Sequence, residues 1–279
     1  MAEAPLQVGH LFHPLDEKLL DLLQSLTPAE WEAPTAARLW KVKDVAAHLL
    51  DGNIRTLSLE RDRYFGQPGP EPGSFEDLVA WLNRFNHQWV DAAKRISPGV
   101  LILLHEATGR QTSDYLMSLP PQEKAIFPVN WAGEEESCNW LHVARQYTEK
   151  WLHQQQIRDA VNKPGIMEKK FFHPFIQTFL YALPYTYRSV DAAEGTLVRI
   201  TIPGTEGGSW DMSRTQEHWE LNSERSLQQD ATAELIIEAD AAWKLFSKSK
   251  RPQEVMDQVV LRGDTELAAV ALDMVSVMA

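Results

Sequence analysis

Glu149 and His153 form the residue pair with the clearest chemical potential in this sequence. They lie four residues apart in Gln146-Tyr-Thr-Glu-Lys-Trp-Leu-His153, so a helix would project both side chains from one face. A carboxylate and an imidazole are both common metal ligands, and the helix fixes their separation in advance. The same face extends to His142, seven residues before Glu149, and to Gln156, three after His153. An ordinary ion pair on a solvated helix face is the competing interpretation of this spacing.

A metal site here needs a third ligand from another element, and His48 is the first candidate. It lies in a helix that the apolar stripe starting at Val42 predicts over 41–65. Asp44 and Asp51, about one turn before and after His48, could orient its ring as hydrogen-bond acceptors, or could be solvated charges. Spacing alone does not bring His48 to the Glu149 pair. A hydrogen-bonded histidine at the edge of the core is therefore the alternative.

Other motifs that carry chemistry are missing from the sequence. It contains no G-x-G-x-x-G, Walker A, G-x-S-x-G or H-E-x-x-H pattern. Cys138 is the single cysteine, which excludes an intrachain disulfide and a thiolate metal cluster. Its acidic surroundings offer nothing that would lower the pKa of a catalytic thiol.

The periodicity of the chain predicts two domains. Apolar residues at helical spacing predict helices over 13–26, 41–65, 74–93, 100–119 and 139–161, with a capping box at Thr27-Pro-Ala-Glu30. After the helix stop at Lys163-Pro-Gly165 the period changes. Helices are then expected over 171–188, 241–247 and 266–278, and Pro184 should break or kink the end of the first of these. Short strands are expected at 196–202, 210–213, 217–221, 233–238 and 258–261. The sequence therefore predicts an all-α domain over 1–165 followed by a small α+β domain over 166–279.

Composition excludes several classes of protein. With 44% hydrophobic and 24% charged residues, the chain has the material of a globular core. Its 27 basic and 39 acidic residues give a net charge of −12, which disfavours nucleic-acid or anionic-membrane partners. The first residues lack the pattern of a signal peptide, and apolar runs are shorter than the ~20 residues of a membrane span. We expect a soluble, cytoplasmic protein, and its oligomeric state is not readable from the sequence.

A family resemblance covers nearly the whole chain. Trp40-Lys-Val-Lys-Asp-Val-Ala-Ala-His-Leu-Leu-Asp-Gly52 resembles the W-x-V-x-D-V-x-A-H-L signature of the DinB-like superfamily. Residues 139–159, Phe172-His-Pro and Leu183-Pro184 are similar to its mycothiol-dependent maleylpyruvate isomerase branch. The resemblance implies an up-and-down four-helix bundle over 1–165 and a sterol-carrier-like domain over 166–279. It also implies a divalent metal, usually zinc with nickel(II) or iron(II) as alternatives, held by His48, Glu149 and His153.

These ligands suggest an enzyme that uses a low-molecular-weight thiol such as mycothiol as cofactor or co-substrate. A metal-held thiolate would attack a small electrophile, giving cis–trans isomerisation or thiol S-transfer. Arg55, Arg145 and Arg214 are candidates to hold a substrate carboxylate, and surface or ion-pair roles are the alternative for each.

The sequence is also compatible with three other functions. Metal-bound water as the nucleophile would make the protein a hydrolase. Two histidines with a carboxylate also hold the metal in iron(II) oxygenases, although such sites usually lie in β-barrels and not in helical bundles. A non-catalytic lipid-binding protein could line an apolar cavity in the second domain, although core packing is the simpler role for these aromatic residues: Trp210, Trp219, Trp243 and Phe246.

Overall fold

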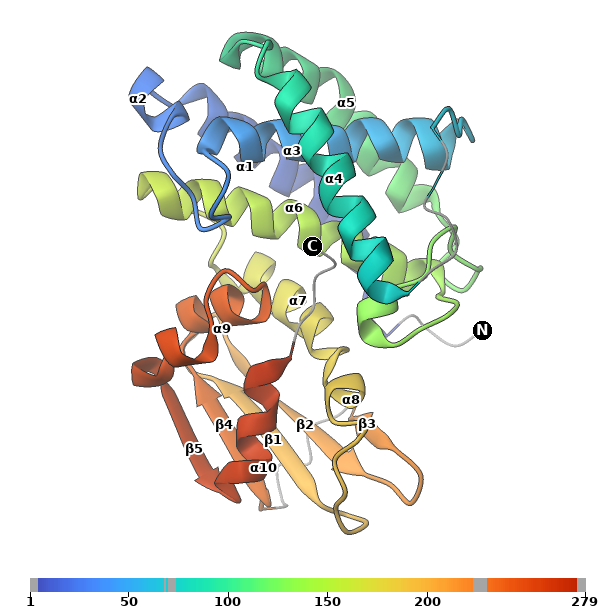
Figure 1. Cartoon of the computed structure of the whole chain (residues 1–279), viewed down its shortest axis with the longest axis vertical. Coiled ribbons are helices and arrows are strands. Elements are labelled where there is room, and N and C mark those ends of the chain that lie inside the picture. The colour runs from blue at the N-terminus through green and yellow to red at the C-terminus, as the bar shows by residue number, and fades with distance from the viewer. Residues whose placement is uncertain (1–4, 68, 70–73, 223–229, 275–279) are drawn as a thin grey trace. The chain divides into compact units, whose positions relative to one another are not determined.

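The chain folds into two compact units in a computed structural model that describes residues 5–67, 69, 74–222 and 230–274 (Figure 1). One unit contains residues 7–126 and 138–166 and is helical. The other contains, among the described residues, 5–6, 127–137, 167–222 and 230–274, and it includes all five strands that the structure assigns there. The architecture is thus a helical region followed by a small mixed-sheet region, as the sequence predicts. The exact boundary after residue 165 stays a prediction.

Four long helices form a bundle in the helical unit, and a fifth packs outside it. Helix α3 packs against α5 and α6, α1 contacts α5 and α6 in turn, and α4 packs against α3. The α-helices of this unit are α1 (Phe12–Gln24), α2 (Pro28–Trp31), α3 (Val42–Arg55), α4 (Phe75–Ala93), α5 (Pro98–Ser118) and α6 (Asn139–Val161), and α1 follows a 3-10 turn, η1 (Gly9–Leu11).

Local sequence explains where these helices begin and which faces they bury. The expected capping box is present at α2, where Thr27 Oγ1 accepts from the Glu30 backbone and Glu30 Oε2 accepts from the Thr27 backbone. Helix α5 starts with Ser97 as its N-cap and Pro98 in its first turn. The apolar stripes of α1 and α3 meet in one core, whose fully or nearly buried members include Leu19, Leu22, Leu23, Val42, Val45, Leu49 and Leu50. Burial of these stripes fixes the rotation of α3 about its axis.

The helix expected over 41–65 is shorter and less regular than its sequence suggests. It ends at Arg61, and its last six residues form a π-helical segment, η2 (Thr56–Arg61). The Asp62 backbone N–H reaches back five residues to the Leu57 carbonyl at 2.9 Å. A π turn inserts one extra residue into the helix, so every side chain beyond it changes direction.

The second unit is built on a five-stranded mixed sheet of order β3-β2-β1-β4-β5. Only the central β1–β4 pair is parallel among the described strands, with Val198 opposite Ala233, and the other three pairs are antiparallel. Helix α10 packs on β1, β4 and β5. The strands are β1 (Leu197–Ile202), β2 (Gly208–Arg214), β3 (Trp219–Leu221), β4 (Ala233–Ile237) and β5 (Val259–Gly263).

The helices of this unit follow the sequence expectation except at the C-terminal end. The helix expected over 171–188 is divided into α7 and α8 at the expected break, where Pro184 starts a new helical turn rather than continuing the first. The helix expected over 266–278 is α10 followed by a 3-10 turn to residue 273, and residues 275–278 lie outside the described part. The helical elements are η3 (Asn130–Ala132), α7 (Lys169–Leu180), α8 (Leu183–Thr186), α9 (Ala239–Phe246), η4 (Pro252–Glu254), η5 (Met256–Gln258), α10 (Thr265–Ala269) and η6 (Val270–Asp273).

Aromatic side chains pack the interior of the sheet unit. Trp210, Trp219, Trp243 and Phe246, the residues considered for a lipid cavity, are all buried. Trp219 meets the ring of Tyr187 edge-on, with 5.2 Å between ring centroids. Such contacts are those of a packed core.

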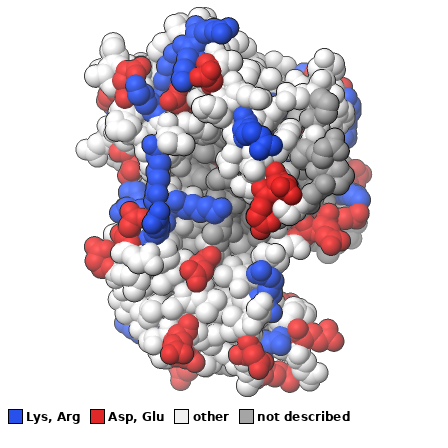
Figure 2. All heavy atoms as spheres, viewed as in Figure 1, with Lys and Arg blue, Asp and Glu red and all other residues white. Residues whose placement is uncertain are grey.

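Surface charge and hydropathy agree with the composition. Acidic and basic side chains are interspersed over the face of the molecule drawn in Figure 2. Within the described residues, every helix is too short or too polar to span a lipid bilayer.

Candidate metal centre

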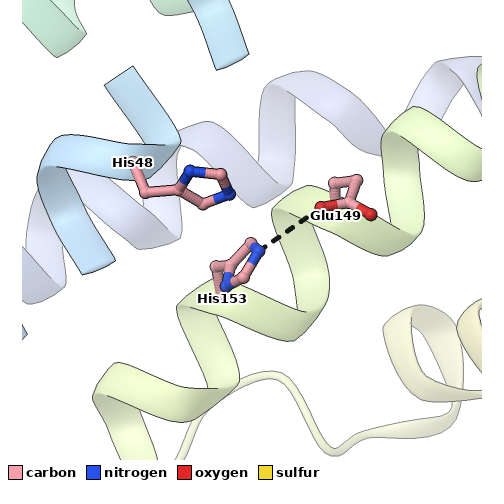
Figure 3. A group of neighbouring side chains, drawn as sticks. All are labelled: His48, Glu149 and His153. Carbon is pink, nitrogen blue, oxygen red and sulfur yellow. Dashed lines mark ion pairs between the residues drawn. The ribbon is translucent and has the colours of Figure 1, made fainter. Parts of the chain in front are cut away.

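The structure brings His48, Glu149 and His153 together (Figure 3). His48 projects from α3, and Glu149 and His153 project from successive turns of α6, with all three side chains pointing toward one another. One potential ligand atom from each residue lies within 4.8 Å of the others. The long-range contact that spacing alone could not establish is therefore present.

Packing of α3 on α6 places the histidine rings in direct contact. The rings of His48 and His153 meet nearly at right angles, with 4.6 Å between centroids. Trp40, just before α3, lies against both rings, with its centroid 4.8 Å from that of His48 and 6.5 Å from that of His153. The apolar indole shields one side of the group and limits the orientations of the two imidazoles.

Gln156 fixes which nitrogen of His153 is available to a metal. Gln156 Oε1 accepts a hydrogen bond from His153 Nδ1 at 2.9 Å, so the other nitrogen, Nε2, presents a lone pair in the neutral ring. That nitrogen lies 3.3 Å from Glu149 Oε2. In the protonated ring this nitrogen donates to the carboxylate as an ion pair, and in the neutral ring its lone pair and the carboxylate oxygen could share a cation.

The donor set fits a divalent ion. Two ligand atoms about 2.0–2.2 Å from a tetrahedral zinc ion lie roughly 3.4 Å apart, close to the 3.3 Å between His153 Nε2 and Glu149 Oε2. His48 Nδ1 is buried and has no hydrogen-bond partner among the described residues. Two imidazoles and one carboxylate leave a coordination position open, which is typical of catalytic zinc sites.

The electrostatic environment favours the metal-binding forms of His48 and Glu149. Burial lowers the pKa of His48 well below its usual value, and the neighbouring charges of His153 and Arg55 lower it further. Burial would raise the pKa of Glu149, but the hydrogen bond from His153 and nearby positive charges outweigh it, so that pKa is lowered. Neutral imidazole and ionised carboxylate are the forms that coordinate metals.

The two aspartates expected to orient His48 have other partners. Asp44 Oδ2 accepts from the Lys41 backbone N–H at 3.1 Å and so caps the start of α3. The carboxylate of Asp51 pairs with Arg55, with 3.0 Å between Oδ2 and Nε. Of the two roles left open for these aspartates, the described structure does not show the contact with His48, because sharing a helix face does not determine where a short side chain bonds.

The three arginines proposed for a substrate carboxylate lie in different places. Arg55 pairs with Asp51 on α3 and lies over the Phe85 ring of α4, with 5.4 Å from Cζ to the ring centroid. Arg145 is half-buried one turn before Glu149, and its charge is among those that lower the pKa of Glu149. Arg214 ends β2 in the sheet unit. Their roles remain predictions.

Two neighbours of the site were not predicted from the sequence as functional residues. Trp40 is part of the family signature, but only the fold shows that it contacts the ligands. Glu60 is nearly fully buried in η2 and accepts from His142 of α6, with 2.9 Å between Oε2 and Nε2. At about 100° per residue, an uninterrupted α-helix would turn Glu60 about 120° from the direction of His48. The extra residue of the π turn reduces this angle by about 100°, so Glu60 points nearly in the direction of His48. The α-helical periodicity of the sequence gives no sign of such a turn.

Comparisons with known proteins agree with the fold that positions these residues. A family model described as the mycothiol maleylpyruvate isomerase N-terminal domain matches residues 12–158. A crystal structure of the mycothiol-dependent maleylpyruvate isomerase is similar over 91% of this chain and 90% of that chain, with a TM-score of 0.54 and 13% identity. A histidine-to-alanine mutant of that isomerase is similar over the same shares, with a TM-score of 0.54 and 12% identity. No curated protein matches the chain.

Proposed function

The chain belongs to the mycothiol maleylpyruvate isomerase N-terminal domain family, and from this premise we propose that it is a metal-dependent enzyme using a small thiol. The proposed reaction is cis–trans isomerisation of a maleylpyruvate-like electrophile, or transfer of the thiol to such an electrophile. The thiol would be mycothiol or a compound of the same kind. The observation that carries the proposal is the convergence of His48, Glu149 and His153, whose potential ligand atoms lie within 4.8 Å of one another.

His48, Glu149 and His153 would hold the ion, with zinc as the metal that best fits two imidazoles and a carboxylate. A divalent ion bound there would deprotonate a coordinating thiol, supplying a thiolate at neutral pH. Trp40 would exclude water from one side of the ligands, given its contacts with both histidine rings.

Isomerisation through a thiolate requires no oxidant or reductant. The sulfur forms a C–S bond with one alkene carbon, and the π electrons move toward the conjugated carbonyl oxygen. The former double bond can then rotate, and the same electrons return to re-form the alkene as the thiolate leaves. With a leaving group in place of the conjugated alkene, the C–S bond would persist and the result would be S-transfer.

Arg145 and Arg55 would bind the carboxylate of the substrate. Arg145 Nε is buried without a hydrogen-bond partner in the described part of the chain, so its guanidinium has an unused donor. A guanidinium is suited to a carboxylate because its donors match both oxygens. Arg214 remains a further candidate from the sheet unit.

Metal content of single variants tests the ligand assignment. Glu149→Gln removes the negative charge while preserving shape, and His153→Ala or His48→Ala removes one nitrogen ligand. Each should lose most of its zinc in elemental analysis after dialysis, while circular dichroism shows that the helices persist, since the bundle has its own apolar core. Asp16→Asn is the matched control and should retain about one ion per chain, because Asp16 pairs with Lys150 and lies outside the ligand group. Wild-type occupancy in Glu149→Gln and His153→Ala would contradict the site.

The thiol requirement is tested separately with the zinc-loaded protein. Isomerisation of maleylpyruvate, followed by absorbance, should depend on added mycothiol and disappear in Glu149→Gln. Metal-dependent turnover of ester or amide substrates without any thiol would contradict the proposal and favour a hydrolase.

A further inference from the structure

Glu60, His142 and Arg145 form a buried hydrogen-bonded chain beside the proposed metal ligands. His142 is fully buried, with its Nε2 2.9 Å from Glu60 Oε2 and its Nδ1 2.8 Å from Arg145 Nη2. Gln146 Nε2 donates to the other carboxylate oxygen of Glu60 at 3.2 Å. Arg145 lies four residues before Glu149 on α6, so the chain ends one helical turn from a ligand.

The chemistry of arginine fixes the direction of every hydrogen bond in this chain. A guanidinium can only donate, so His142 Nδ1 must accept from Arg145. His142 is therefore neutral, and its single N–H, on Nε2, donates to Glu60. Burial lowers the pKa of His142, and the charge of Arg145 lowers it further, in agreement with this tautomer.

The position of Arg145 affects whether Glu149 is available to a metal. Residues four apart on a helix can form an ion pair, and Arg145 and Glu149 have the right charges for one. In the described structure they form no such pair: Arg145 is turned to His142, and Glu149 faces His153. The carboxylates of Glu60 and Glu149 both act on the Arg145 guanidinium and oppose the lowering of its pKa by burial. The two carboxylates therefore compete for one cation.

We propose that Glu60, acting through neutral His142, is a positioning residue that holds Arg145 away from Glu149 and so leaves that carboxylate free for the metal. The inference rests on the proposed metal site. The π-helical segment η2 has a role in this tether, because it directs Glu60 toward α6. Without the tether, Arg145 turns to Glu149 and competes with the ion.

Zinc affinity in a double-mutant cycle tests this tether. Glu60→Gln keeps an acceptor for His142 but removes the charge, and His142→Leu removes both hydrogen bonds. We expect zinc binding, measured by competition with a chromophoric chelator, to weaken about tenfold in Glu60→Gln and more in His142→Leu. In an Arg145→Gln background the competitor is gone, so adding either substitution should change affinity by less than about twofold.

Asp16 provides the matched control, since it is another largely covered carboxylate of the bundle, 13% exposed and paired with Lys150 at 2.6 Å. Asp16→Asn should bind zinc as the wild type does, even where its melting temperature falls. Should His142→Leu fail to fold by circular dichroism, the conservative Glu60→Gln pair still completes the cycle.

Two outcomes overturn the tether. One is wild-type affinity in Glu60→Gln, and the other is an equal loss with and without Arg145, which would mean that Glu60 acts on the site independently. A wild-type chain that binds no zinc would instead overturn the metal site itself, and the tether with it.

Discussion

Replacing Gln156 with leucine should weaken metal binding although Gln156 is not a ligand. Its Oε1 accepts the hydrogen bond that holds His153 with Nε2 facing Glu149. Leucine has a similar volume and cannot accept a hydrogen bond. In Gln156→Leu the metal-bound state must therefore leave the His153 Nδ1–H without its partner, whereas the metal-free ring can turn or change tautomer.

The size of the effect follows from the burial of the pair. Gln156 is 4% exposed, and the His153 side chain is 13% exposed. An unsatisfied buried donor costs about 1–3 kcal/mol, and the small residual exposure of His153 argues for the middle of this range. A loss of about 2 kcal/mol corresponds to roughly 30-fold weaker binding, within the 10–100-fold typical of partners that orient metal ligands.

Competition with a chromophoric chelator at pH 7.5 measures this affinity directly. Gln156→Glu should bind zinc more tightly than the wild type, because an ionised acceptor strengthens the hydrogen bond and makes the ring more basic. Gln155→Leu is the control, since Gln155 is the adjacent buried glutamine and does not contact a ligand in the described structure. Zinc affinity of Gln156→Leu within about threefold of both the wild type and Gln155→Leu would refute the reasoning.

Two further predictions concern stability of the metal-free protein. Burial lowers the pKa of His105 from 6.5 to about 4, so between these pH values the unfolded chain binds more protons and acid destabilises the fold. Urea titrations at pH 7.5 and pH 5 measure how far the free energy of unfolding falls on acidification. This fall should be about 2 kcal/mol smaller in His105→Gln than in the wild type, and equal falls would contradict the lowered pKa of His105. Gln154 is fully buried with both amide atoms unpartnered in the described structure, so Gln154→Leu should raise the free energy of unfolding by about 1 kcal/mol. A lower melting temperature in that variant would show that the amide is satisfied.

Local sequence patterns predict the helices. They also predict the pair Glu149 and His153, the part of the site that lies on a single helix. The stripes of α1 and α3 are buried as their spacing indicates, and Glu149 and His153 share a face of α6 because four residues make about one turn. The expected strands also exist, with bounds that differ by a few residues. Each of these features depends on neighbours in the sequence.

The missed features depend on contacts between distant segments. The approach of His48 to α6 follows from packing of two helices and was expected only from the family resemblance. The π segment that turns Glu60 inward has no periodic signature, and the parallel pairing of β1 with β4 joins strands that are not consecutive. The sequence left the roles of Asp44 and Asp51 open, because a nearby backbone N–H and a nearby arginine also compete for their carboxylates.

The regularity of α6 connects the two ends of the proposed site. Arg145, Glu149, His153 and Gln156 recur at intervals of four, four and three residues, so they form one stripe along the helix. The ligands lie in the middle of this stripe, and each end is held by a hydrogen bond to another side chain: His153 by Gln156, and Arg145 by His142. Substitutions at the two ends should therefore act on the same carboxylate and imidazole by different routes, one through the orientation of His153 and the other through competition for Glu149. Because Arg145 has an unused donor at Nε and is also the proposed competitor for Glu149, its replacement should free the metal ligands and at the same time remove a substrate contact. Arg145→Gln should therefore bind zinc more tightly than the wild type and at the same time bind an anionic substrate more weakly, which would appear as a higher KM.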